Sequence, residues 1–217
     1  MPTVLSTKKL TESQRSLLLQ AGISLVEYNA IAIRPEYFEV KTKIDNAIIT
    51  SQNTVKALLD KKVQIENCFC VGKKTKELLE GNGYKVKVMT NYGKELAEII
   101  VDKFADESFT FFCGNLRRDE IPELLKKHKV NFTEIEVYQT VLKPKNFERT
   151  FDGVLFFSPS AVDSFTKGNN LKNTTAFCIG TTTAAEVGKY TNEINVATKP
   201  TIENVIVQIV KYFKKYK

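Results

Sequence analysis

Several features that would identify common protein classes are scarce or absent in this sequence. The chain of 217 residues has no tryptophan and a single histidine. No apolar run approaches the roughly 18 residues that a membrane-spanning helix needs. The N-terminus lacks the charged-then-apolar order of a signal peptide. We therefore expect a soluble, cytoplasmic protein that does not bind a membrane.

The few metal-binding and nucleophilic residues are poorly placed for chemistry of their own. The four cysteines, Cys68, Cys70, Cys113 and Cys178, form no C-x-x-C pair and lie mostly in apolar runs, which favours buried free thiols over a zinc site or disulfides. The one histidine, His128, sits in a basic run and is expected to be exposed at a helix end. It leaves no basis for a Ser-His-Asp system. No Walker loop or G-x-G-x-x-G motif is present, so we expect no cofactor and no metal.

The net charge of +7 and the isoelectric point near 9.1 favour an anionic partner, such as a phosphate, a polycarboxylate or a nucleic acid. The alternative is a basic protein whose lysines are simply solvated, because much of the excess lies in residues 61–62 and 211–217. No stripe of basic and aromatic residues supports nucleic-acid binding. We therefore expect no nucleic acid as partner.

One signature occurs twice. Residues 45–55 and 152–162 both run from an aspartate through an apolar stretch to a serine and the start of an amphipathic segment, at an offset of 107 residues. Residues 69–75 and 177–183 share an aromatic-Cys-apolar-Gly start and a final threonine, at an offset of 108 residues. Internal repetition of this kind predicts two similar lobes.

Strands are expected to alternate with helices through both copies. A weaker repeat relates residues 3–33, where residues 23–33 read as one β region, to residues 109–140. The alternation predicts an α/β fold with two similar lobes, each built on a parallel sheet. Extended runs that end in Pro35 and Pro144 indicate linkers between the lobes. Periodicity leaves open which half of the chain the N-terminal unit joins.

Ligands of parallel α/β proteins bind where strands end and helices begin. Helix N-termini offer free N–H groups and partial positive charge there, which suit carboxylates and phosphates. The residues at these positions are Thr50, Ser51, Gly72, Thr75, Gly114, Asn115, Ser158, Ser160, Gly180, Thr182 and Thr183. We expect this symmetric set to line a cleft and bind an anionic ligand.

Some of these hydroxyls have a structural alternative. Thr54, Thr75 and Ser160 are favourable helix N-caps, and Ser160 followed by Asp163 fits a capping box. Tyr138 is the best candidate for an acid, because it lies where a strand leaves a lobe for the linker. Its alternative is a packed ring with a hydrated hydroxyl.

Together, several stretches resemble the uroporphyrinogen-III synthase family, in family order and over nearly the whole chain. They are residues 49–55, 71–75, 113–118, 137–140, 156–160, 179–183 and 199–201. In one respect the chain differs: family members often carry arginine just after the first strand, where this sequence has Lys8 and Lys9. Lysine offers charge but no bidentate fork.

The resemblance implies a domain organisation. The N-terminal unit would close on the C-terminal half, so that lobe 1 comprises residues 1–31 and 146–217. Lobe 2 would comprise residues 44–132. Residues 32–43 and 133–145 would form a two-stranded β linker between the lobes.

The resemblance also implies an activity. The expected enzyme is a monomeric lyase of tetrapyrrole (haem) biosynthesis that cyclises hydroxymethylbilane, with inversion of ring D and loss of water, without metal or cofactor. Tyr138 matches the tyrosine proposed in the family to protonate the leaving hydroxyl. The preceding pathway enzyme is the expected donor of the substrate. The alternative is a non-catalytic, two-lobed regulatory protein that binds a tetrapyrrole or another polyanion.

Overall fold

The computed structural model describes residues 1–40 and 43–215 and divides the chain into two compact units. Unit 1 consists of Met1–Ala32 and Val141–Lys217, and unit 2 of Ile33–Thr140. The N-terminal segment therefore joins the C-terminal part of the chain. The bounds expected for the two lobes and for the linker stay predictions. Residues 41, 42, 216 and 217 of those ranges lie outside the described residues.

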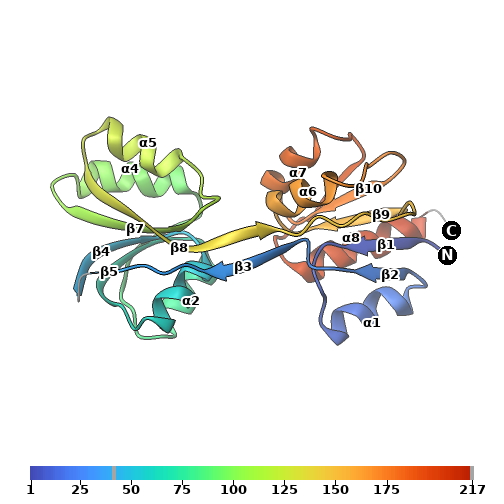
Figure 1. Ribbon diagram of the computed structural model, residues 1–217, viewed down its shortest axis with the longest axis horizontal. Coiled ribbons are helices and arrows are strands. Elements are labelled where there is room, and N and C mark those ends of the chain that lie inside the picture. The colour runs from blue at the N-terminus through green and yellow to red at the C-terminus, as the bar shows by residue number, and fades with distance from the viewer. Residues whose placement is uncertain (41–42, 216–217) are drawn as a thin grey trace. The chain divides into compact units, whose positions relative to one another are not determined.

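Unit 1 is a parallel sheet of five strands between two pairs of helices (Figure 1). In spatial order the strands are β11 (Ile194–Val196), β10 (Thr175–Cys178), β9 (Gly153–Phe156), β1 (Thr3–Ser6) and β2 (Ser24–Glu27). One face carries α1 (Glu12–Gln20) and α8 (Ile202–Lys215), and the other carries α6 (Pro159–Thr166) and α7 (Thr181–Val187).

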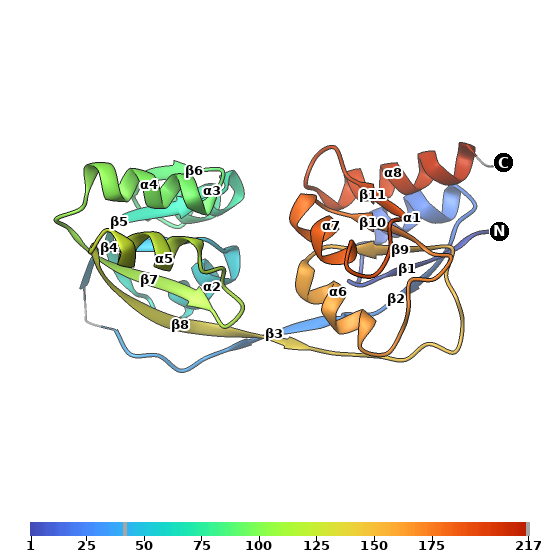
Figure 2. The same cartoon turned by 90° about the horizontal axis from the view of Figure 1, so that it is seen from above.

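Unit 2 has the same three layers, seen from a second direction in Figure 2. Its strands, in spatial order, are β3 (Ile31–Pro35), β8 (Asn131–Leu142), β7 (Ser108–Gly114), β4 (Lys43–Ile49), β5 (Gln64–Val71) and β6 (Val86–Thr90). The helices are α2 (Gln52–Asp60) and α3 (Lys73–Glu80) on one face, and α4 (Gly93–Lys103) and α5 (Glu120–Lys127) on the other. The chain passes between the units within β3 and β8, which are neighbours in this sheet.

The strand orders demonstrate the duplication. Five strands of unit 2, read as β6-β5-β4-β7-β8, follow the same spatial order as β11-β10-β9-β1-β2 of unit 1. The signature at residues 45–55 forms β4 and the start of α2, and its copy at residues 152–162 forms β9 and the start of α6. The prediction of two similar parallel α/β lobes is confirmed.

The second β region of the sequence is divided. Residues 23–33 were expected to form one segment, but the structure separates β2 from β3 by residues 28–30. The Tyr28 and Ala30 amides donate to the carbonyls of Ser6 and Thr7, at the end of β1, rather than to a further partner strand. The prediction of a single segment is wrong, because the sheet of unit 1 ends there.

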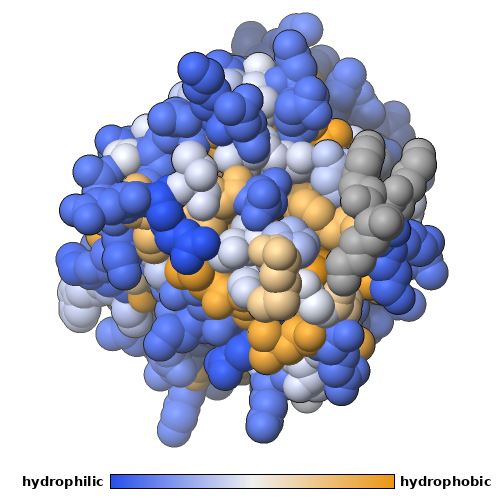
Figure 3. All heavy atoms as spheres, turned by 90° about the vertical axis from the view of Figure 1, so that its right-hand side faces the viewer, coloured by the Kyte–Doolittle hydropathy of each residue, from blue (hydrophilic) through white to orange (hydrophobic). Residues whose placement is uncertain are grey.

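Each sheet is covered on both faces by its own apolar cluster. In unit 2, α2 and α3 pack Val55, Leu58 and Leu79 against one face, whereas α4 and α5 cover the other. On the face of unit 1 in Figure 3, hydrophilic side chains surround a group of apolar ones near the middle. No helix among the described residues has both the length and the apolar character to cross a bilayer.

All four cysteines are buried free thiols, as expected. Burial raises the pKa of the Cys68 and Cys178 thiols to about 12 and that of Cys70 and Cys113 to about 11. The reactive thiolate is therefore disfavoured in the folded protein.

We predict that the native protein reacts with a thiol-specific disulfide reagent at pH 8 far more slowly than the unfolded chain. Unfolding returns each thiol to water and to a pKa near 8.5. The measurement compares the labelling rate in buffer with that in concentrated guanidinium chloride, where the control is complete reaction of four thiols. Rapid labelling of any cysteine in the folded protein would contradict this prediction.

Candidate functional site

The eight helices of the described residues all begin at the carboxyl edges of the two sheets, but their first turns differ in charge. Acidic residues occupy the first turns of α1, α4, α5 and α8. The first turns of α2, α3, α6 and α7 contain none. These four helices are equivalent in pairs through the duplication. Their positive ends are thus not neutralised by their own side chains, which leaves them suited to external anions.

In unit 2, Ser51 is the N-cap of α2. Its hydroxyl caps the helix by accepting a hydrogen bond of 3.1 Å from the Asn53 amide, and Thr50 lies beside it at the end of β4. Thr54, expected as a possible cap, lies within the helix instead. Its hydroxyl is fully buried and has no hydrogen-bond partner among the described residues. The capping interpretation of Thr54 is wrong, because Ser51, three residues earlier, already caps the helix.

The next helix, α3, begins at a glycine. Gly72 has a φ of 88°, which favours glycine, and it offers no side chain to the helix end. Thr75, also a candidate cap, lies inside the first turn and is buried, and its amide donates to the Gly72 carbonyl. The cap is Gly72, so no side chain of the cap residue competes with an anion at this helix end.

Tyr138 lies against Gly114. A β-carbon at position 114 would come within 2.4 Å of the Tyr138 ring, so only glycine allows the ring to lie there. The Tyr138 hydroxyl donates a hydrogen bond of 3.2 Å to the Ser51 hydroxyl. The structure therefore brings together Tyr138, Gly114 and Ser51, three residues that the sequence placed on three different elements.

The sequence contained no signal for the local geometry that produces this contact. In β7 and β8, Cys113 pairs with Glu136 but Gly114 pairs with Tyr138, so the register shifts by one residue on β8. Two consecutive residues, Val137 and Tyr138, consequently pack against the same apolar cluster. Such a bulge redirects a side chain that would otherwise face the opposite side of the sheet.

Unit 1 repeats the helix-end arrangement. Ser158 caps α6 by accepting a bond of 3.2 Å from the Ala161 amide, and its hydroxyl is 3.0 Å from that of Ser160. The expected capping box of Ser160 with Asp163 is wrong, because Pro159 already begins the helix and Ser160 lies within it. The other candidate positions of unit 1 follow one another along the chain in the same order as their counterparts in unit 2.

In α7, Gly180 is the cap and supplies no side-chain hydrogen bond, as Gly72 does in α3. Thr183 is buried, as its counterpart Thr75 is, and Thr182 is exposed. In each unit, therefore, one helix of the pair is capped by a serine and the other by a glycine. Within unit 1 the structure places Ser158, Ser160, Gly180, Thr182 and Thr183 at the ends of two adjacent strands.

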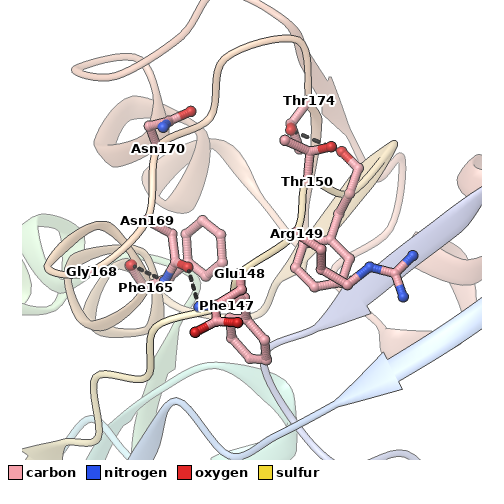
Figure 4. A pocket seen from close by; sticks show the side chains of 10 residues that line it. Phe147, Glu148, Arg149, Thr150, Phe165, Gly168, Asn169, Asn170 and Thr174 are labelled. Carbon is pink, nitrogen blue, oxygen red and sulfur yellow. Dashed lines mark hydrogen bonds between the residues drawn. The ribbon is translucent and has the colours of Figure 1, made fainter.

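A cavity of about 790 Å³ lies at the opposite edge of unit 1 (Figure 4). It is bordered by the segment before β9 and the turn after α6, with Phe147, Phe151 and Phe165 among its lining residues. The Asn169 amide donates to the carbonyls of Lys145 and Phe165 and accepts from the Phe147 amide. The side-chain amide of Asn169 is therefore engaged with the backbone of this loop and is not available to a ligand. For this reason we locate the candidate site at the carboxyl edges of the two sheets.

Comparison with known proteins agrees with the arrangement of the chain. The family model described as "Uroporphyrinogen-III synthase HemD" matches residues 12–206. The curated "Porphyrin biosynthesis protein HemD" of Ruminiclostridium josui is 26% identical over 131 residues, which cover 55% of this chain and 26% of that protein. The match thus spans about a quarter of the length of that relative.

Solved structures share the fold over the full chain. The uroporphyrinogen-III synthetase of Helicobacter pylori has a TM-score of 0.72 at 17% identity, covering 98% of this chain and 100% of that one. A mutant uroporphyrinogen III synthase of the extremely thermophilic bacterium Thermus thermophilus has a TM-score of 0.71 at 11% identity, covering 99% of this chain and 100% of that one.

We predict that Gly114→Ala lowers the free energy of unfolding by about 1–3 kcal/mol, the usual cost of forcing extra atoms into a packed site. The added methyl group would displace the Tyr138 ring. Denaturant unfolding of the variant and the parent protein measures this cost. In a Tyr138→Ala background the same substitution should cost little, because the ring is gone. An equal cost in both backgrounds would show that the ring is not what excludes a side chain at position 114.

Proposed function

Because the chain belongs to the uroporphyrinogen-III synthase family, we propose that it cyclises hydroxymethylbilane to uroporphyrinogen III with inversion of ring D and loss of water. The observation that carries this proposal is the pairwise repeated set of helix N-termini without acidic first turns. Hydroxymethylbilane, the substrate of this family, bears eight carboxylates. A basic protein with several open helix ends suits such a ligand.

Substrate binding would use backbone groups more than charged side chains. The N-termini of α2 and α3 in unit 2, and of α6 and α7 in unit 1, would each bind a carboxylate through amide N–H groups. Ser51, Thr50, Ser158, Ser160 and Thr182 would add hydroxyl donors. Gly72 and Gly180 would allow the substrate to approach the backbone closely. Thr75 and Thr183 are buried and would support the helix ends from within.

The chemical step requires one proton donor. Tyr138 would give its hydroxyl proton to the hydroxymethyl oxygen, so that water leaves and an azafulvene cation remains. The substituted carbon of ring D would then attack the cation and form a spiro intermediate, which fragments and recloses as the type III isomer. The proton lost when the last pyrrole re-forms would restore the tyrosine, which leaves one water as the by-product.

Most of the rate and all of the isomer selectivity would come from positioning. Closure without the enzyme gives the type I isomer, so the protein must hold the two ends of the chain in the less accessible orientation. The hydrogen bond from Tyr138 to Ser51 orients the tyrosine hydroxyl toward the N-terminus of α2, where we propose that a carboxylate binds. We also propose that the enzyme acts as a cytoplasmic monomer that receives its substrate from the preceding pathway enzyme.

We predict that the purified protein converts freshly prepared hydroxymethylbilane mainly to the type III isomer. The measurement oxidises the products and separates the uroporphyrin isomers, with a reaction without protein as control. Exclusive type I product at the rate of the control would refute the enzymatic function. Binding of the product without turnover would support a regulatory binding protein in its place.

We predict that Tyr138→Phe lowers kcat by up to about 100-fold, the low end of the contribution of a positioned general acid. Product affinity should stay nearly unchanged, because the ring still packs on Gly114. The matched control is Tyr84→Phe, which also removes a hydroxyl in unit 2, one that donates to the Val63 carbonyl. A wild-type kcat for Tyr138→Phe would exclude Tyr138 as the acid.

A further inference from the structure

The position of Tyr138 depends on how β8 is held just after the bulge. The regular pairing of β7 with β8 ends at Gly114, and β7 itself ends there. β8 nevertheless continues to Leu142, and Figure 2 shows it running on past β7. On its other side β8 keeps β3 as its hydrogen-bonded neighbour. On the β7 side, beyond Gly114, something other than the regular strand ladder must hold the backbone that carries Tyr138 in register.

Asn115 makes three hydrogen bonds to this part of β8. Its backbone amide donates to the Tyr138 carbonyl at 3.3 Å. Its side-chain oxygen accepts from the Thr140 amide at 2.8 Å, and its side-chain nitrogen donates to the Thr140 carbonyl at 3.4 Å. The side-chain amide of Asn115 thus replaces the peptide group that the next residue of a strand would have supplied.

Thr140 is the last residue of unit 2 before the chain enters unit 1. The clamp therefore acts at the end of the segment that bears Tyr138, two residues from it. The bulge lies on the other side, at Val137, whose side chain is fully buried. Tyr138 is held between a buried anchor and a hydrogen-bonded clamp, although Asn115 itself is exposed.

We propose that Asn115 is a positioning residue that acts through Tyr138: its amide clamps Thr140 and so fixes the tyrosine ring over Gly114, with the hydroxyl at Ser51. The expected effect of Asn115 on turnover rests on the proposed function. Its effect on the position of Tyr138 does not. It differs from the expectation that Asn115 binds the substrate, because the amide is engaged with the backbone of β8. A residue in this role affects the rate through the tyrosine and leaves substrate affinity alone.

The structural arm of the test follows Tyr138 without substrate. In protein labelled with 3-fluorotyrosine, the Tyr138 fluorine resonance is identified by its loss in Tyr138→Phe. Asn115→Ala should shift this resonance and should speed hydrogen exchange of the Thr140 amide about tenfold, as expected for the loss of one hydrogen bond. Asn115→Asp keeps the acceptor for that amide and should restore most of the protection. Leu116→Ala, at the exposed neighbouring position, is the control and should change neither signal.

The kinetic arm is a double-mutant cycle with Tyr138→Phe. Asn115→Ala alone should lower kcat about tenfold at an unchanged KM. In the Tyr138→Phe background it should have no further effect, because the group through which it acts is missing. An additive loss, or a rise in KM, would overturn the proposal and assign Asn115 to the substrate. An unchanged fluorine resonance in Asn115→Ala would also overturn it.

The two arms separate this inference from the function on which it is built. If the wild-type protein makes no type III isomer, the proposed function fails, and the resonance and the exchange rate still decide whether Asn115 positions Tyr138. If the wild type is active and the cycle is additive, the function stands and the positioning role fails.

Discussion

The candidate site depends on a single steric constraint: the ring of Tyr138 occupies the space that any side chain at position 114 would need. That contact joins β8 to β7 and brings the tyrosine hydroxyl to Ser51, the residue that caps α2. A tyrosine hydroxyl and a helix N-terminus are thereby held side by side. Without a glycine at the end of β7, the ring would have to move and the two groups would separate.

A second feature is electrostatic, and the duplication repeats it within each unit. The two helices that follow the first two strands of each repeated segment begin without acidic residues, whereas the other four helices carry them. A glutamate in the first turn stabilises an isolated helix end, and its absence leaves the positive end available to a ligand. The same solution in both copies suits a ligand that carries many identical negative groups.

One buried polar group behind these helix ends is unpaired and lowers the stability of the fold. Thr54 has a fully buried hydroxyl without a partner among the described residues, directly behind the cap of α2. An unpaired buried hydroxyl costs roughly 1–3 kcal/mol. The corresponding residue of α6, Ala161, carries no such group and is buried in the apolar cluster. The two copies have therefore diverged in detail while they keep the same caps.

The sequence by itself determined the duplication, the alternation of strands and helices and the residues at the strand ends, because these depend on local pattern and on spacing along the chain. It did not determine the helix caps, which are Ser51, Gly72 and Ser158 rather than Thr54, Thr75 and Ser160, since the residue at which each helix begins is set by how the helix packs on its sheet. The bulge at Val137, the clamp from Asn115 to Thr140 and the contact of Tyr138 with Gly114 were decided by tertiary structure alone. Each of them requires two strands to lie side by side, and no local pattern in either strand records the register between them.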